Sequence, residues 1–183
     1  GIIHVRGIVE KYKESAIASI HYYNIEETHY DIPKRKVEFL PIGQVRLKEG
    51  TIFYERQQNM LNYVLNIDDD QMLYNFRRAS GLDTHGAAPM TGWDEENCKL
   101  KGHTTGHYMS GLALAWGATG NPKFREKINY IVDGLEECQV AFAESGEYHT
   151  GYLSAYDEEQ FDLLEQFTRY PEIWAPYYTL DKI

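Results

Sequence analysis

The sequence predicts a mainly α fold built of helical hairpins, each an apolar inner helix followed by an amphipathic outer helix, with a short β-hairpin segment before them. After about residue 51, apolar residues recur at three- and four-residue steps, which is the spacing of one helix face. Residues 1–24 are instead β-rich and in part alternate between apolar and polar, as strands do. Paired inner and outer helices are the repeat unit of an α/α barrel or an α-solenoid.

Two β-rich runs, 2–9 and 15–23, predict the hairpin within residues 1–24. Two strands alone are marginal in water, so we expect them to be the end of a larger β-sandwich module that begins upstream. The polar stretch around Pro33 predicts a linker, which we place over residues 25–44. The helical domain then covers residues 45–183, and we expect these residues to be only its N-terminal part.

The first two helices are predicted by their caps and their apolar spacing. Residues 52–65 carry apolar side chains at helical intervals. The run from Asp68 to Asp70 supplies a cap for a second, short helix through Phe76, which stops before Gly81.

The next predicted element is an inner helix over residues 105–118. This segment is apolar on nearly every face and is broken at Gly120, where Asn and Pro follow. We expect Thr105 to cap the helix, neighbouring helices to cover it on all sides, and Trp116 to lie in the core.

An amphipathic outer helix is predicted after it, because apolar residues from Phe124 to Phe142 recur at helical steps with charged residues facing away. A glycine-led aromatic loop at 151–156 then leads into a short amphipathic turn. A further inner helix is expected to begin just after Trp174.

Composition excludes several classes of partner. The 28 acidic and 18 basic side chains give a net charge of -10, which repels nucleic acids and anionic lipid surfaces. No apolar run approaches the roughly 18 residues that a membrane span needs. The many Tyr, Trp and His residues suit a neutral polar ligand such as a sugar, whose C–H faces pack on aromatic rings. Cys98 and Cys138 match no disulfide framework or metal-ligand spacing and are expected to be plain thiols.

The most informative motif is the histidine pair His103 and His107, bracketed by glycines where a loop enters the apolar helix. Three interpretations stay open. The pair could bind a metal, although Thr104 stands where the zinc-protease motif has Glu. It could be satisfied by hydrogen bonds at the helix N-terminus, or it could hydrogen-bond a polar ligand.

Glycosidic bond cleavage needs two catalytic groups about 5–10 Å apart, and the sequence offers many acids but no constrained pair. Asp94, Glu95 and Glu96 follow Trp93 in a predicted loop. Glu95 is the candidate for contact with a substrate, and a solvated acidic turn explains the same residues. Trp93 and Trp174 adjoin loops, so each could stack on a sugar or pack in the core.

From about residue 45 onward, the chain resembles the N-terminal part of the catalytic domain of bacterial β-L-arabinofuranosidases in glycoside hydrolase families 127 and 146. The matching segments occur in order across roughly three quarters of the chain. They are 45–47, 75–82, 92–95, the His103/His107 motif, 112–115, 118–121, 151–155 and 174–180.

The resemblance implies an (α/α)6 barrel, of which this chain would supply the first part. It also implies a retaining glycosidase that removes terminal β-L-arabinofuranose from plant-type glycans. In that family the nucleophile is a cysteine thiolate held in a zinc site, and a glutamate is the acid/base. Zinc in the parent catalytic domain would keep the sulfur deprotonated.

Those catalytic residues and metal ligands lie in later helices of the family's barrel, so the resemblance assigns none to this chain. We therefore expect residues 1–183 alone to be inactive and the missing remainder of the domain to be a partner. The resemblance suggests five substrate-binding residues. They are His103, His107, Trp93, Glu95 and Tyr152. Asp181 stands where the family usually has His, which puts the specificity in doubt.

Residues 1–24 resemble the closing strands of a bacterial Ig-like module, which implies a secreted or cell-surface protein. Two other functions are kept as alternatives to the glycosidase. One is a non-catalytic helical carbohydrate-binding module, and the other is a sugar epimerase or lyase on an α/α barrel.

Overall fold

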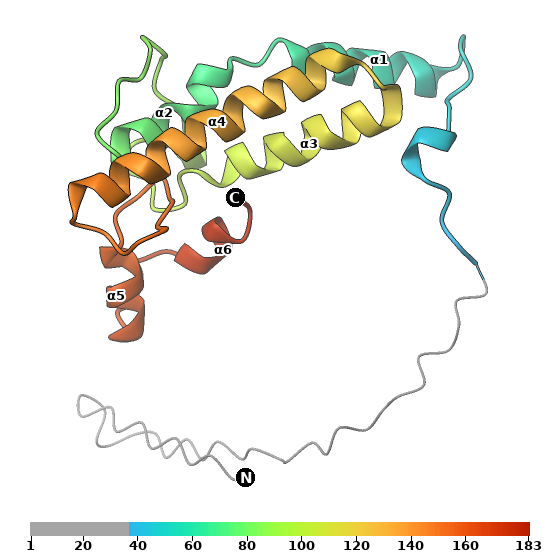
Figure 1. Cartoon of the computed structure of the whole chain (residues 1–183). Coiled ribbons are helices and arrows are strands. Elements are labelled where there is room, and N and C mark those ends of the chain that lie inside the picture. Colours follow the sequence, from blue (N-terminus) through green and yellow to red (C-terminus); the bar gives the residue numbers. More distant parts are fainter. Residues whose placement is uncertain (1–36) are drawn as a thin grey trace, which may run out of the picture. The chain divides into compact units, whose positions relative to one another are not determined.

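The computed structural model describes residues 37–183, in which six α-helices and two short 3-10 helices occur but no strand (Figure 1). The helices take up most of the described chain, so the prediction of a mainly α fold is confirmed. The predicted β-hairpin and most of the predicted linker lie outside the described residues. Closure into an (α/α)6 barrel stays a prediction.

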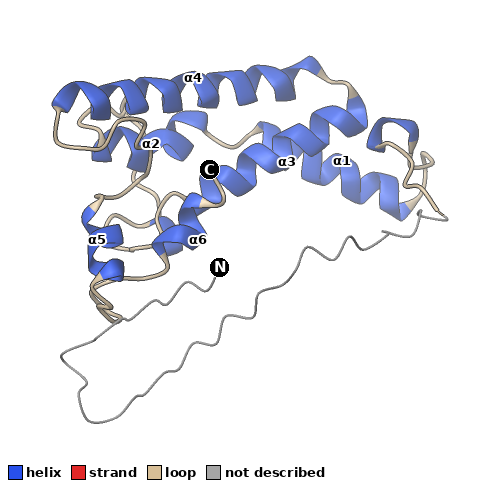
Figure 2. Ribbon diagram, turned by 60° about the horizontal axis from the view of Figure 1, so that its bottom comes forward, coloured by secondary structure: helices blue, strands red, loops and turns tan. Residues whose placement is uncertain are grey.

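The elements follow the predicted order. They are η2 (Ile42–Gln44), α1 (Ile52–Leu65), α2 (Asp69–Ala79), η3 (Gly92–Asp94), α3 (His103–Thr119), α4 (Pro122–Ser145), α5 (Glu159–Glu165) and α6 (Pro176–Leu180). Helices α3 and α4 lie side by side as a hairpin, and both contact α2 (Figure 2). Helix α6 contacts α3 and α5. In the described part of the chain, no helix is long and apolar enough to cross a membrane.

Side-chain caps explain where α2 and α4 begin. Asp68 Oδ1 accepts hydrogen bonds from the backbone N–H groups of Asp70 and Gln71, at 2.9 and 3.3 Å, which confirms the predicted cap. Asn121 Oδ1 accepts from the Lys123 N–H at 3.1 Å, and Pro122 occupies the first turn of α4. Polar residues in the connecting loops therefore satisfy backbone donors that the helices leave free.

The hydrophobic core lies between α2, α3 and α4. Its fully buried side chains are Leu73 and Phe76 of α2, Leu112 of α3, and Phe124, Ile131 and Cys138 of α4. Helices α2 and α4 approach closely, because a Cβ on Gly134 would lie only 2.5 Å from Leu73 Cδ1. A glycine on α4 thus makes room for a leucine on α2.

Helix α3 is not covered on every side within residues 37–183. Leu114 is 60% exposed and Trp116 is 41% exposed, so the prediction that Trp116 lies in the core is wrong. The buried residues Tyr108, Leu112 and Ala115 recur at three- and four-residue steps and form one stripe. Trp116 lies off that stripe, with the guanidinium carbon of Arg125 5.9 Å from its ring centroid.

A charge network around the buried Arg77 also ties α2 to α4. The Arg77 side chain is only 2% exposed, and its Nη1 lies 2.6 Å from Asp70 Oδ1. The Tyr130 hydroxyl on α4 donates to the same oxygen at 2.5 Å, and His85 Nδ1 lies 3.3 Å from it. Burial raises the pKa of Asp70, but the hydrogen bonds from Tyr130 and Arg77 outweigh burial, so its pKa is below the usual value of 3.8.

We predict that Asp70→Asn lowers the free energy of unfolding by about 1–3 kcal/mol at pH 7, because buried Arg77 loses its countercharge. The carboxylate is 30% exposed, which reduces the cost. Its pKa is lower in the folded state, so the stabilisation is complete above about pH 4 and is lost as the pH falls through the folded-state pKa.

Urea unfolding at a series of pH values would measure this difference. Asp133→Asn, which changes an exposed carboxylate on α4, is the matched control and should shift stability by less than about 0.5 kcal/mol. A gap between wild type and Asp70→Asn that stays constant from pH 7 to pH 3 would contradict the assignment.

Candidate functional site

The predicted histidine motif lies where the loop after η3 enters α3. The helix begins at His103, and Gly102 before it has a φ of 101°, a backbone conformation that side chains disfavour. A Cβ on Gly102 would also lie 2.7 Å from the Cβ of Ala155. The chain therefore needs glycine at this entry, both for its backbone angle and for the close approach of the 151–156 loop.

Asp94 of η3 caps the N-terminus of α3, although it lies eight residues before Gly102 in the sequence. Its Oδ1 accepts the Gly102 backbone N–H at 2.6 Å, and its Oδ2 accepts the Thr104 hydroxyl. The Asp94 side chain is only 4% exposed, so water does not compete for these bonds. The prediction that Thr105 caps the helix is wrong: the Thr105 hydroxyl is buried and donates to the Met72 carbonyl of α2 at 2.8 Å.

His103 is buried at the same point. Its Nδ1 lies 3.0 Å from the carbonyl oxygen of Leu100. A carbonyl can only accept, so Nδ1 carries the hydrogen, and in the neutral ring Nε2 remains as an acceptor. Asp94 Oδ2 lies 3.6 Å from the same Nδ1. The backbone and the carboxylate together fix the orientation of the imidazole.

Aromatic rings from three segments gather around His103. Its ring centroid lies 5.6 Å from Trp93, 5.9 Å from His107 and 6.3 Å from Tyr178. Trp174 lies edge-on to Trp93, with centroids 6.4 Å apart. We call these five residues the Trp93 cluster. The structure thus brings together three of the five residues predicted to bind substrate.

Much of the Trp93 cluster faces solvent. Trp93 is 59% exposed, and His107, Tyr178 and Trp174 are also exposed, whereas His103 is buried. A partly open aromatic surface over an oriented imidazole can stack on the C–H face of a ring and hydrogen-bond its hydroxyls. Sequence reasoning misses Tyr178, and the signal for it is its place in the matching segment 174–180.

The other two predicted residues lie differently. Glu95 directly follows Asp94 and is exposed, with no side-chain hydrogen bond to any residue of the described chain. Tyr152 stacks on Tyr148, with centroids 5.4 Å apart, and its hydroxyl donates to the Tyr156 carbonyl at 2.5 Å. Burial raises the pKa of Tyr152, so its hydroxyl stays protonated. Substrate contact by Glu95 and Tyr152 stays a prediction.

A close contact explains why Gly106, inside the histidine motif, is a glycine. The carbonyl oxygen of Lys182 passes so close to α3 that a Cβ on Gly106 would lie 1.6 Å from it. Figure 1 shows the C-terminal end of the chain lying near the beginning of α3. This close approach brings α6 against α3 and places Tyr178 beside His103.

The described residues do not fit the zinc that the resemblance implies. No three His, Cys, Asp or Glu side chains gather within residues 37–183 in a way that could hold a metal ion. Cys98 and Cys138 are free, and burial raises the pKa of the Cys138 thiol, which disfavours the thiolate that zinc binds.

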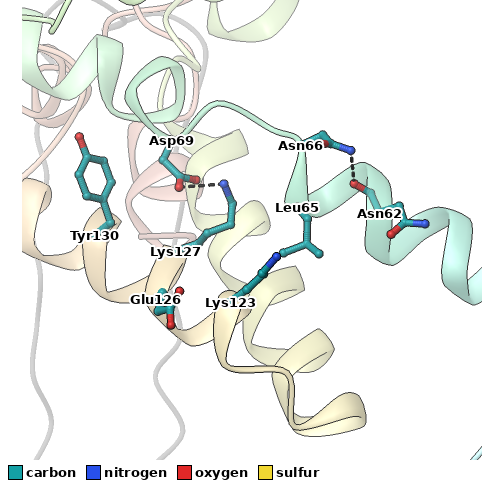
Figure 3. Close-up of a pocket in the computed structure, with 8 residues that line it drawn as sticks. All are labelled: Asn62, Leu65, Asn66, Asp69, Lys123, Glu126, Lys127 and Tyr130. Atoms are coloured by element: carbon teal, nitrogen blue, oxygen red, sulfur yellow. Dashed lines mark hydrogen bonds and ion pairs between the residues drawn. The ribbon is translucent and has the colours of Figure 1, made fainter.

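A separate hollow of about 580 Å³ lies between the end of α1, the start of α2 and the first turns of α4 (Figure 3). Within it, Lys127 Nζ donates to Asp69 Oδ2 at 2.8 Å and to the Ile67 carbonyl at 2.9 Å. None of the five residues predicted to bind substrate lines this hollow. It is therefore distinct from the Trp93 cluster.

A comparison with known protein families identifies the family of this chain. The family model for the GH127 catalytic domain of β-L-arabinofuranosidases matches residues 44–183. The chain belongs to this family. The resemblance to family 127 is thereby confirmed, and the match spans all six α-helices and the whole Trp93 cluster. A search of curated proteins finds no match. Membership in GH127 makes the domain part of a glycoside hydrolase, so its expected ligand is a carbohydrate.

We predict that Gly106→Ala displaces residues 176–183 from α3, because the new methyl group would overlap the Lys182 carbonyl. Hydrogen exchange followed by mass spectrometry should show at least about tenfold faster exchange in this segment, together with a loss of about 1–3 kcal/mol of stability. Gly111→Ala on the same helix is the control, because its Cβ would meet nothing within 4 Å. Equal exchange of residues 176–183 in the two variants would refute the prediction.

Proposed function

We propose that the protein containing this chain is a retaining glycosidase that removes terminal β-L-arabinofuranose from arabinose-containing, plant-type glycans. Membership in GH127 supports the reaction class. The observation that carries the proposal is the Trp93 cluster, where exposed indole and phenol rings stand over an oriented imidazole. Such a surface suits a neutral sugar, and the net charge of -10 disfavours anionic ligands.

In this proposal the chain's own residues bind and orient the sugar. Trp93 stacks on a C–H face, and the free Nε2 of His103 accepts a hydrogen bond from a hydroxyl group. His107 and Glu95 are exposed and contribute further polar contacts. Tyr152 contributes less directly, because its hydroxyl already has a backbone partner.

The nucleophile and the acid/base are proposed to come from parts of the parent protein outside residues 1–183. This follows the resemblance to the family, which implies a cysteine nucleophile whose thiolate form zinc would stabilise. The resemblance of residues 1–24 to an Ig-like module supports the further proposal of a secreted or cell-surface location.

A second candidate is a non-catalytic carbohydrate-binding module. It is favoured by the same cluster, because residues 37–183 present a ligand surface and the sequence offers no constrained pair of catalytic acids. A sugar epimerase or lyase on the same scaffold is the remaining alternative.

We predict that the full-length protein releases L-arabinose from an aryl β-L-arabinofuranoside and leaves the α-anomer intact. Proton NMR of the first product should show the β-anomer, as retention requires. Trp93→Ala should raise KM about tenfold by removing the stacking surface. Residues 1–183 alone should show no turnover.

Product analysis separates the alternatives. An isomerised or unsaturated sugar would replace the glycosidase by an epimerase or lyase. Binding of arabinose-containing glycans by the full-length protein, without turnover of either anomer, would identify a binding module instead.

A further inference from the structure

We infer that Asp94 is a positioning residue for the sugar site, because it joins three segments of the chain and thereby holds the Trp93 indole at a fixed distance from the His103 imidazole. This inference rests on the proposed function in so far as the Trp93 cluster binds sugar. Its structural part can be tested without any substrate.

Asp94 is held at both its backbone and its side chain. Its main-chain carbonyl accepts the Asn75 side-chain amide of α2 at 2.7 Å, and Asn75 is itself buried. Its carboxylate accepts the Gly102 N–H and the Thr104 hydroxyl at the start of α3. A single residue of η3 is thus bonded to two different helices.

The charge of Asp94 suits this place. The carboxylate lies at the N-terminus of α3, where the helix dipole favours a negative charge. Its carboxylate accepts hydrogen bonds from the Gly102 backbone and from the Thr104 hydroxyl. Among the described residues it pairs with one ionisable group, His103, at 3.6 Å. With the side chain 4% exposed, water cannot replace these partners without opening the loop.

Trp93 and His103 are the chain neighbours of the two bonded groups. Trp93 precedes Asp94 directly, and His103 follows Gly102 directly, so the bond between Asp94 and Gly102 fixes where both side chains start. The indole has little other support, because it is 59% exposed and its ring contacts in the described structure are His103 and Trp174. Loss of the bond would therefore separate the rings before it disturbed the core.

The first test is kinetic and uses the full-length enzyme. Asp94→Asn should lower kcat/KM on the β-L-arabinofuranoside by up to about tenfold, as loss of a residue that positions a binding group does, and the effect should appear mainly in KM. Glu96→Gln removes an equal charge from the same loop, where the Glu96 side chain pairs with exposed Arg78, and should change kcat/KM less than about twofold.

A double-mutant cycle separates positioning from general loss of stability. If Asp94 acts through Trp93, Asp94→Asn should add little to the effect of Trp93→Ala on kcat/KM. Fully additive effects of the two changes would overturn the inference. Thr104→Val removes one of the bonds to Asp94 while keeping the shape of the side chain, and it serves in place of Asp94→Asn if that variant does not fold.

The second test needs no substrate. In protein labelled with 5-fluorotryptophan, the resonance that disappears in Trp93→Phe belongs to Trp93. It should broaden and move toward its unfolded position in Asp94→Asn, while Glu96→Gln leaves it unchanged. An unchanged Trp93 resonance in a folded Asp94→Asn variant would overturn the inference. An inactive wild type with the expected fluorine shift would instead refute the proposed function and leave the positioning role standing.

Discussion

Helix α2 packs closely against both α3 and α4, and each part of the candidate site is attached to that packing. Six consecutive residues of α2 are buried, from Met72 to Arg77, which requires contacts on every side of the helix. Leu73 fills the space left by Gly134 on α4, and a Cβ on Gly102 would lie 3.1 Å from Phe76. Packing at the density of a protein interior fixes the distance between helices, and therefore the start of α3.

Polar groups of α2 also form hydrogen bonds to the segments around the start of α3. Asn75 donates to the Asp94 carbonyl, and the Met72 carbonyl accepts the Thr105 hydroxyl of α3. Both bonds are buried, so breaking either one leaves a polar group without water or a partner. An apolar core alone would allow α3 to slide along α2, whereas these directional bonds require one register. The geometry of the Trp93 cluster therefore depends on the register of α3 against α2.

Local rules predict much of this fold. The caps at Asp68 and Asn121 and the spacing on α4 involve residues close together in sequence, so the chain itself encodes the start of each helix. The cap of α3 is different, because Asp94 lies eight residues before Gly102 and reaches it through a folded loop. A rule based on neighbouring residues selects Thr105 as the cap of α3 instead. The Thr105 hydroxyl, however, donates a hydrogen bond to the Met72 carbonyl of α2.

The candidate site is less predictable than the fold, because it depends on tertiary contacts. His103, His107 and Trp93 stand out by residue type and by their glycine neighbours, and the structure does bring them together. Tyr178 has no glycine neighbour, and its sequence signal is only its place in the matching segment 174–180. Its place beside His103 depends on the close approach of the Lys182 carbonyl to Gly106, a contact between residues far apart in the sequence.

Helix α6 shows how such a contact acts on the site. Five residues are too few for a helix that is stable by itself, so tertiary contacts must hold Pro176–Leu180 in place. The Tyr156 hydroxyl donates to the Pro176 carbonyl at 2.6 Å, and Tyr177 packs on Phe161 with centroids 5.1 Å apart. The next residue, Tyr178, faces His103. The aromatic packing around residues 151–161 therefore reaches the Trp93 cluster through two adjacent tyrosines, and it supports the site without touching a ligand.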